Sequence, residues 1–265
     1  MATIVGASFQ VVIPILTGPA IGQVAEENRS LVVPAGYAFA IWNLIFLLCF
    51  VYAAYQALPA NRDNPLLRRI GWFFAGAFFL DGLWEILFPA RRFLLAQVVI
   101  VSTFVCLAVA YLYLAREARR RALSVTERWL VKLPLGLFFG WITAATFVGF
   151  ATTFVALGLL GGGASEALVG VALLLTGGLL ASVVILYGKT APGPGFYLPY
   201  AAAILWALVA VIVNQYDDSI LTTGAAVFAS ALVASALLGA LGGGSPGKGA
   251  GRLAKPGAAR PRGLL

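Results

Sequence analysis

The chain contains no histidine, only two cysteines and only 11% charged residues among its 265. The lack of histidine excludes most zinc sites, haem-histidine sites and Ser-His catalytic arrangements. Cys49 and Cys106 lie far apart within apolar stretches, so we expect them to act as small hydrophobic side chains. The glycines at 161–163 are not followed by Lys-Ser or Lys-Thr, which excludes a P-loop phosphate site. No metal and no cofactor are therefore expected.

The scarcity of charged residues also indicates that the protein lies in a membrane and not in water. With 61% hydrophobic residues and a mean hydropathy of +0.95, the chain has too few polar side chains to cover a soluble globule. We therefore expect an all-α, polytopic transmembrane helix bundle. Each crossing needs roughly 20 apolar residues, and we place eight spans near residues 2–20, 35–58, 70–90, 93–115, 129–158, 165–187, 197–215 and 219–241. The first is the weakest, because Gln10 and Pro14 interrupt it.

The loops differ in their content of Lys and Arg. With the N-terminus inside, the inside loops and the C-terminal tail hold fourteen of these residues, and the outside loops hold three. Because Lys and Arg stay on the cytoplasmic side in short loops, we expect a cell-membrane protein with both termini in the cytoplasm. We interpret the net charge of +8 as topology and contact with membrane lipids, not as nucleic-acid binding. Residues 242–265 lack periodicity, which predicts a disordered basic tail.

Two acidic residues fall inside the third span. Arg69 marks its inner end, so Asp81, twelve residues on, lies about 18 Å deep at 1.5 Å per residue. Glu85 follows one turn later on the same helix face. A charged carboxylate costs a few kcal/mol there, so we expect Asp81 to be protonated and hydrogen-bonded toward a ligand or a neighbouring helix. An alternative for Glu85 is that it extends toward Arg91 or Arg92 at the membrane surface.

Aromatic residues open the second span, where Tyr37, Phe39, Trp42 and Phe46 follow Pro34. One interpretation is an aromatic belt that anchors the helix at the bilayer boundary. The other is a wall of flat surfaces on which a rigid hydrophobic ligand stacks.

Three stretches together resemble the tryptophan-rich sensory proteins of the translocator protein family (peripheral benzodiazepine receptor, TspO/MBR). The first is the proline-aromatic stretch 34–46, the second is Leu80-Asp81-Gly82-Leu83-Trp84 with Phe88 beyond it, and the third is Trp141-Ile142-Thr143-Ala144-Ala145. They occur in the family's order within roughly residues 1–160. The chain departs from the family pattern at three positions: Ala35 replaces a second proline, and Asp81 and Gly149 replace asparagines.

The resemblance implies a five-helix bundle with a pocket for porphyrins, sterols and similar flat hydrophobic ligands, closed by the loop between the first two helices. In this chain that loop is Gly22 to Val33. We expect residues 1–160 to form the translocator-protein-like bundle and 161–241 to add three transmembrane helices. Because Asp81 and Gly149 replace asparagines, this chain lacks the two amide side chains that the resemblance implies would help line the pocket. The expected ligand-binding residues are Tyr37, Phe39, Trp42, Asp81, Trp84, Glu85, Trp141 and Thr143.

We expect a sensor or carrier that binds a flat hydrophobic small molecule such as a porphyrin or sterol-like ligand, without enzymatic activity. Trp206 lies outside the matched stretches and is expected to have no part in binding. One alternative is a proton-coupled small-molecule transporter that uses Asp81 and Glu85. Another is a membrane scaffold, which predicts no pocket. The expected partners are the ligand and membrane lipids, and a homodimer is left open.

Overall fold

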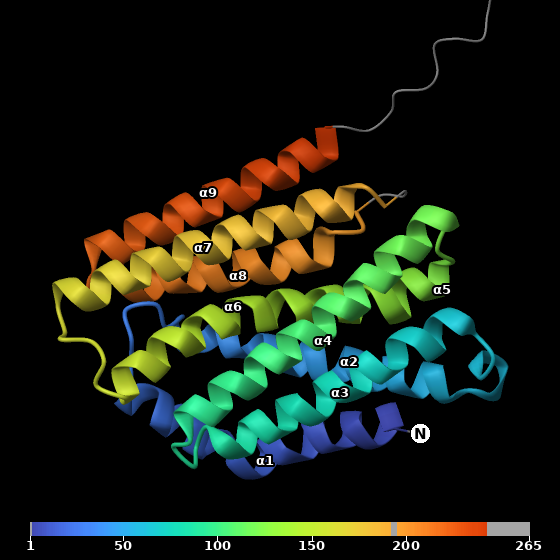
Figure 1. Cartoon of the computed structure of the whole chain (residues 1–265), viewed down its shortest axis with the longest axis horizontal. Coiled ribbons are helices and arrows are strands. Elements are labelled where there is room, and N and C mark those ends of the chain that lie inside the picture. Colours follow the sequence, from blue (N-terminus) through green and yellow to red (C-terminus); the bar gives the residue numbers. More distant parts are fainter. Residues whose placement is uncertain (1, 192–194, 243–265) are drawn as a thin grey trace, which may run out of the picture.

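A computed structural model describes residues 2–191 and 195–242, and every regular element in these residues is helical (Figure 1). These residues contain eight long helices, and each is long and apolar enough to cross a membrane. The predicted all-α bundle with eight membrane-crossing helices is thereby confirmed. In chain order the elements are α1 (Ala2–Glu27), η1 (Gly36–Ala40), α2 (Ile41–Ala57), η2 (Pro59–Asn61), α3 (Pro65–Leu87), α4 (Phe93–Arg120), α5 (Val125–Glu127), η3 (Arg128–Lys132), α6 (Leu133–Ala156), α7 (Ala164–Lys189), α8 (Leu198–Gln215) and α9 (Ile220–Gly242).

Several helix ends differ from the predicted spans. The first span continues to Glu27 although Pro14 and Pro19 lie inside it. The loop to the second span is therefore shorter than the predicted Gly22 to Val33. The third span begins at Pro65, because the side chain of Asn64 accepts hydrogen bonds from the first backbone N–H groups.

The fifth span also begins earlier than predicted, and again a cap explains it. Ser124 and Glu127 form a capping box, in which each side chain bonds the backbone N–H of the other residue. A short π-helical segment, η3, then joins α5 to α6. The predicted disordered tail lies outside the described residues except for Gly242.

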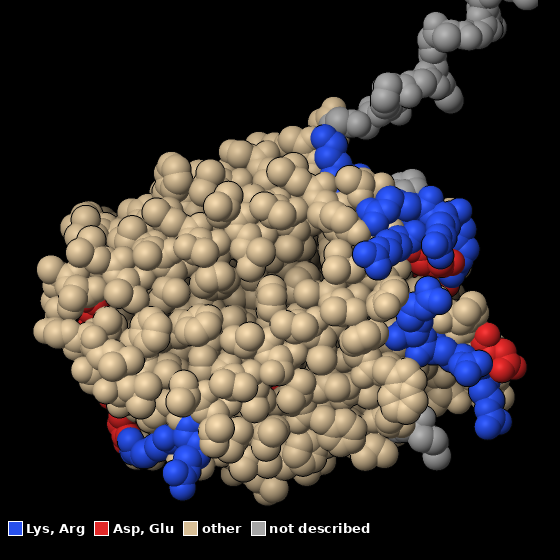
Figure 2. Space-filling view, in the orientation of Figure 1, with Lys and Arg blue, Asp and Glu red and all other residues tan. Residues whose placement is uncertain are grey.

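The helices pack in a series that runs across the bundle. Helix α1 lies against α3, α3 against α4, α4 against α6, and α6 against α8, while α9 covers α7 and α8 (Figure 1). The start of α1 and the end of α9 lie at the same end of the bundle, as an even number of spans requires. Figure 2 shows Lys and Arg gathered mainly at that end, with a smaller charged group at the other and an uncharged belt between them.

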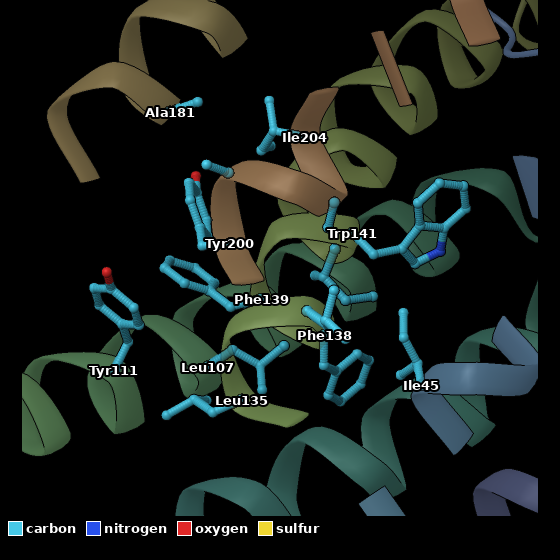
Figure 3. Packing of buried hydrophobic residues seen from close by; sticks show 14 of the residues in the cluster. Ile45, Leu107, Tyr111, Leu135, Phe138, Phe139, Trp141, Ala181, Tyr200 and Ile204 are labelled. Carbon is cyan, nitrogen blue, oxygen red and sulfur yellow. The ribbon is translucent and has the colours of Figure 1, made fainter. Parts of the chain in front are cut away.

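The hydrophobic core is centred on α6 and continues into the last three helices (Figure 3). The ring of Phe139 lies 4.9 Å from that of Tyr200 in α8 and 5.4 Å from that of Tyr111 in α4. The close approach of α6 and α8 depends on Gly136 and Gly140. A Cβ atom on Gly140 would lie 2.5 Å from the carbonyl oxygen of Tyr200. These two glycines, four residues apart, thus act as a small-residue packing motif. The division of the chain at residue 160 stays a prediction, and the core crosses it without a break.

Candidate functional site

A cavity of about 110 Å³ lies between α6, α7 and α8, near the ends of α1 and α3. Its walls are almost entirely apolar, and the hydroxyl side chains among them come from two threonines, Thr143 and Thr152. The lining residues are Ala25, Val32, Val33, Pro34, Phe39, Trp84, Phe88, Trp141, Thr143, Ala144, Ala145, Phe147, Val148, Gly149, Thr152, Leu173, Leu174, Gly177, Gly178, Ile204, Ala207, Leu208 and Val211.

Aromatic rings from three different segments face this cavity. Trp84 near the end of α3 and Phe88 just beyond it, one turn further on, stack with their ring centres 4.9 Å apart. Phe39 from η1 meets Trp141 from α6 edge to face, at 5.9 Å between ring centres and an angle of 84°. The rings thus form flat and edge-on surfaces around one space, which is the arrangement that aromatic packing favours.

Four of the eight predicted binding residues line the cavity, namely Phe39, Trp84, Trp141 and Thr143. Trp42 does not, because it lies behind Trp141, with ring centres 6.0 Å apart, and stacks on Phe46. It supports the wall without reaching the space inside. Of the three tryptophans among the expected binding residues, Trp84 and Trp141 thus line the cavity.

Tyr37 also lies outside the cavity, where its ring meets the edge of Trp206 at 5.5 Å. The indole Nε1 of Trp206 donates a hydrogen bond of 2.9 Å to the carbonyl oxygen of Ala38. Because Ala38 and Phe39 belong to the same short helix, η1, this bond fixes the segment that carries Phe39. Trp206, which the sequence placed outside the site, is therefore a supporting residue of the cavity wall.

The loop between α1 and α2 closes one side of the cavity with Val32, Val33 and Pro34. Two amides of α8 hold it: Asn214 and Gln215 donate to the carbonyl oxygen of Val33 at 2.9 and 3.1 Å.

Further contacts attach the same loop to α7 and α8. The backbone N–H of Ala35 donates to the carbonyl oxygen of Ala210, and that of Leu31 donates to the carboxylate of Glu166 in α7. Arg29 pairs with Asp218 at 3.0 Å, just beyond α8. Two of the three helices beyond residue 160, α7 and α8, therefore both line the cavity and hold the loop that closes it.

Asp81 and Glu85 do not line the cavity, because they belong to a separate buried polar cluster between α1 and α3. Gln10 of α1 donates from Nε2 to Oδ2 of Asp81 at 2.7 Å. The residue that weakened the prediction of the first span thus supplies the partner of Asp81. Gly82 allows this contact, because any side chain there would collide with the ring of Phe9 in α1.

The cluster is incompletely paired within the described residues. Gln10 Oε1 and Glu85 Oε2 are buried and accept no hydrogen bond there. Glu85 forms no ion pair in this part of the chain, and Arg91 pairs with Glu27 instead. The alternative in which Glu85 extends to Arg91 is therefore not what the structure shows. Buried oxygens without a hydrogen bond are costly. Gln10 Oε1 and Glu85 Oε2 are therefore available to a proton or to another hydrogen-bond donor.

At Gly149, the other position where the family pattern has asparagine, a side chain from a neighbouring helix fills the space. Gly149 lines the cavity, and the side-chain amide oxygen of Gln97 from α4 lies 2.5 Å from where a Cβ atom of residue 149 would be. Gln97 also donates to the carbonyl oxygen of Thr146 at 3.2 Å. An amide from a neighbouring helix therefore occupies the space beside the glycine that stands where the family has asparagine.

Comparison with known protein families supports the resemblance to the translocator protein family that the sequence shows. The family described as TSPO-like protein matches residues 1–241, which include all eight long helices. Searches of curated proteins and of solved structures found no match. The family match covers the three helices beyond residue 160 as well as the aromatic stretches. The chain is therefore a multi-pass membrane protein and belongs to the TSPO-like family.

Proposed function

We propose that this protein binds a flat hydrophobic small molecule, such as a porphyrin or a sterol-like compound, in the cavity between α3, α6, α7 and α8. The observation that carries the proposal is the wall itself, an apolar space faced by Phe39, Trp84, Phe88 and Trp141. Apolar pockets with aromatic walls and few polar groups are the usual form of small-molecule sites. Binding without chemistry, as in a sensor or carrier, fits a site without a catalytic constellation.

The polar content of the cavity sets what it can recognise. The hydroxyl of Thr143 donates to the carbonyl oxygen of Phe139 at 2.7 Å and accepts from Tyr200 at 3.3 Å. It therefore has little capacity left for a ligand. Selection rests on shape and on stacking against the rings, and this favours rigid ring systems over flexible polar molecules.

The size of the cavity implies that binding widens it. About 110 Å³ is less than the roughly 300–1,000 Å³ typical of ligand pockets. The loop at Val32 and Val33 is a wall that lies outside the long helices, and two hydrogen bonds and one ion pair attach it to α8 and to Asp218, while Val32 packs against α7 at Gly170. We therefore expect the ligand to enter as this loop separates from α8.

A cavity-filling substitution tests the proposal. Ala145→Leu adds volume inside the cavity, whereas Ala202→Leu makes the same change on the exposed face of α8. Titration of the purified protein with protoporphyrin, followed by tryptophan fluorescence, should show weaker binding in the first variant only. Equal binding in the two variants would place the ligand elsewhere. No saturable binding of protoporphyrin or of a sterol probe to the unchanged protein would refute the proposal.

A second candidate function is proton-coupled transport of a small molecule. The observation that favours it is the buried Gln10, Asp81 and Glu85 cluster, with unpaired oxygens on Gln10 and Glu85. Acidic residues inside a membrane bundle commonly mark proton paths. Flux into vesicles that depends on a pH gradient would favour this function, and binding without flux would favour a sensor. A scaffold role gains no support from a fold that contains a cavity.

A further inference from the structure

A second hollow, of about 310 Å³, lies at the end of the bundle where α3 begins and α4 ends. It shares no residue with the aromatic cavity. Its lining residues are Pro65, Leu66, Arg69, Tyr113, Arg116, Glu117 and Arg120. Figure 2 shows that Lys and Arg are concentrated at this end of the molecule. The charge-based topology assigns the same end to the cytoplasm.

The hollow carries an excess of positive charge. Its one carboxylate, on Glu117, pairs with Arg121 at 2.8 Å, and Arg121 also binds Glu127 at 2.7 Å. These partners raise the pKa of Arg121, with Glu127 the larger cause and Glu117 the smaller. Glu117 is therefore paired with a residue outside the hollow, and the three arginines of the hollow outnumber its one carboxylate.

Among the described residues, no carboxylate pairs with any of the three arginines of the hollow, Arg69, Arg116 and Arg120. Two of them converge on one aromatic ring. The guanidinium carbon of Arg69 lies 5.5 Å from the ring centre of Tyr113, and that of Arg116 lies 5.9 Å from it. Cation–π attraction can hold each guanidinium there. It also brings two like charges together, and an anion between them would relieve their repulsion.

The position of the hollow indicates which kind of anion it can bind. Arg69 lies within the first two turns of α3, and Arg116 and Arg120 lie within the last two turns of α4, so all three sit at the level of lipid headgroups. Trp72, one turn from Arg69 on α3, is 75% exposed, as expected for an aromatic side chain at the membrane interface. Pro65, Leu66 and the ring of Tyr113 give the hollow an apolar side, and Phe73 packs 5.7 Å from Tyr113 between their ring centres.

We propose that this hollow is a binding site for the phosphate group of an anionic phospholipid. Guanidinium groups bind phosphate through paired, charge-assisted hydrogen bonds. Tyr113 holds Arg69 and Arg116 at the site, and Arg120 adds a third charge. The apolar side accommodates the glycerol and the first part of the acyl chains, which a free phosphate lacks.

The test compares two double variants with the same change of charge. Arg69→Gln with Arg116→Gln removes the pair over Tyr113, while Arg62→Gln with Arg128→Gln removes two arginines near the same end but outside the hollow. Native mass spectrometry of the full chain would measure how much phosphatidylglycerol each protein retains, with phosphatidylcholine as the neutral lipid. Thermal unfolding of each variant checks that it is folded.

We expect the first variant to retain phosphatidylglycerol at least roughly tenfold more weakly, because it loses two guanidinium groups that would make charge-assisted hydrogen bonds to the phosphate, and we expect no change in the second. Equal loss in both variants would overturn the proposal, because it would indicate general attraction between basic residues and anionic lipid. No loss in either variant would overturn it as well. A further arm adds inorganic phosphate at millimolar concentration. If it displaces phosphatidylglycerol completely, the site is one for free phosphate and the lipid proposal is wrong.

Discussion

Trp206 and Ala38, 168 residues apart in the chain, are joined by a hydrogen bond of 2.9 Å from the indole Nε1 to the carbonyl oxygen. This bond connects α8 to η1, the segment that carries Phe39 into the cavity wall. We predict that Trp206→Phe, which keeps a ring near Tyr37 but removes the donor, weakens protoporphyrin binding. A single hydrogen bond contributes about 0.5–1.5 kcal/mol, so the expected change in Kd is about two- to tenfold. An unchanged dissociation rate by stopped-flow fluorescence would show that η1 does not need this bond.

Trp84 provides the most direct test of the aromatic wall. Trp84→Ala should weaken ligand binding by about 1 kcal/mol or more, because it removes one stacking surface. Trp72→Ala is the matched control, since Trp72 lies on the same helix but is 75% exposed and away from the cavity. Fluorescence titration of both variants would decide, and similar losses in the two would point to general destabilisation of α3.

The pairing of Gln10 with Asp81 predicts opposite results for two substitutions. Asp81→Asn keeps an acceptor for Gln10 Nε2 and adds a donor for Gln10 Oε1, so stability should be preserved. Asp81→Ala leaves the Gln10 amide buried without a partner and should cost about 1–3 kcal/mol. Thermal unfolding in detergent measures both effects.

The same pair of variants addresses transport. If the protein couples flux to protons, Asp81→Asn should abolish the dependence of vesicle uptake on a pH gradient, because an amide cannot carry the proton. Ligand binding should be unchanged, since Asp81 lies outside the cavity. Uptake in this variant that still responds to the gradient would remove Asp81 from any proton path.

Close packing of α6 on α8 predicts the effect of a larger side chain at Gly140. Gly140→Val introduces atoms where the carbonyl oxygen of Tyr200 and the Cβ of Ala203 already lie. We expect a loss of about 1–3 kcal/mol, the usual cost of overpacking a core. Gly224→Val is a useful comparison, because nothing lies within 4 Å of a Cβ atom at that glycine. Equal stability of the two variants would argue against the tight contact.

The charge asymmetry of the loops predicts the topology. Reporter fusions after Leu58 and Leu265 should be located inside, and a fusion after Gly163 should be located outside. The start of α1 and the end of α9 lie at the same end of the bundle, as an even number of spans requires. A reporter after Leu265 found outside would require a different number of spans.

The number of spans was predictable because crossing a bilayer demands a long apolar run, and that demand is local in sequence. The starts of α3 and α5 also carry recognisable sequence patterns. Asn64 with Pro65 and Ser124 with Glu127 are common at the start of a helix. Helix α4 continues beyond its predicted end to Arg120 because long basic side chains can extend to the membrane surface.

The site was only partly predictable, because hydropathy does not show which face of an apolar helix meets which neighbour. Trp141 and Trp84 line the cavity, whereas Trp42, from the same family pattern, lies one layer behind. Gln10 could be recognised only as an interruption of a span until its contact with Asp81 was known. The contribution of α7 and α8 depends on contacts such as Asn214 with Val33, which no local pattern indicates.

Asn214 and Val33 are also separated by 181 residues, and this distance has a consequence for how the protein is made. A chain emerging from the ribosome inserts its first helices long before α8 has been synthesised. During that interval the loop after α1 lacks the amides that hold it, and the cavity lacks the wall supplied by α7 and α8. The site is therefore completed only near the end of synthesis, and a nascent chain that stops after α6 contains the aromatic stretches without a closed place to hold a ligand.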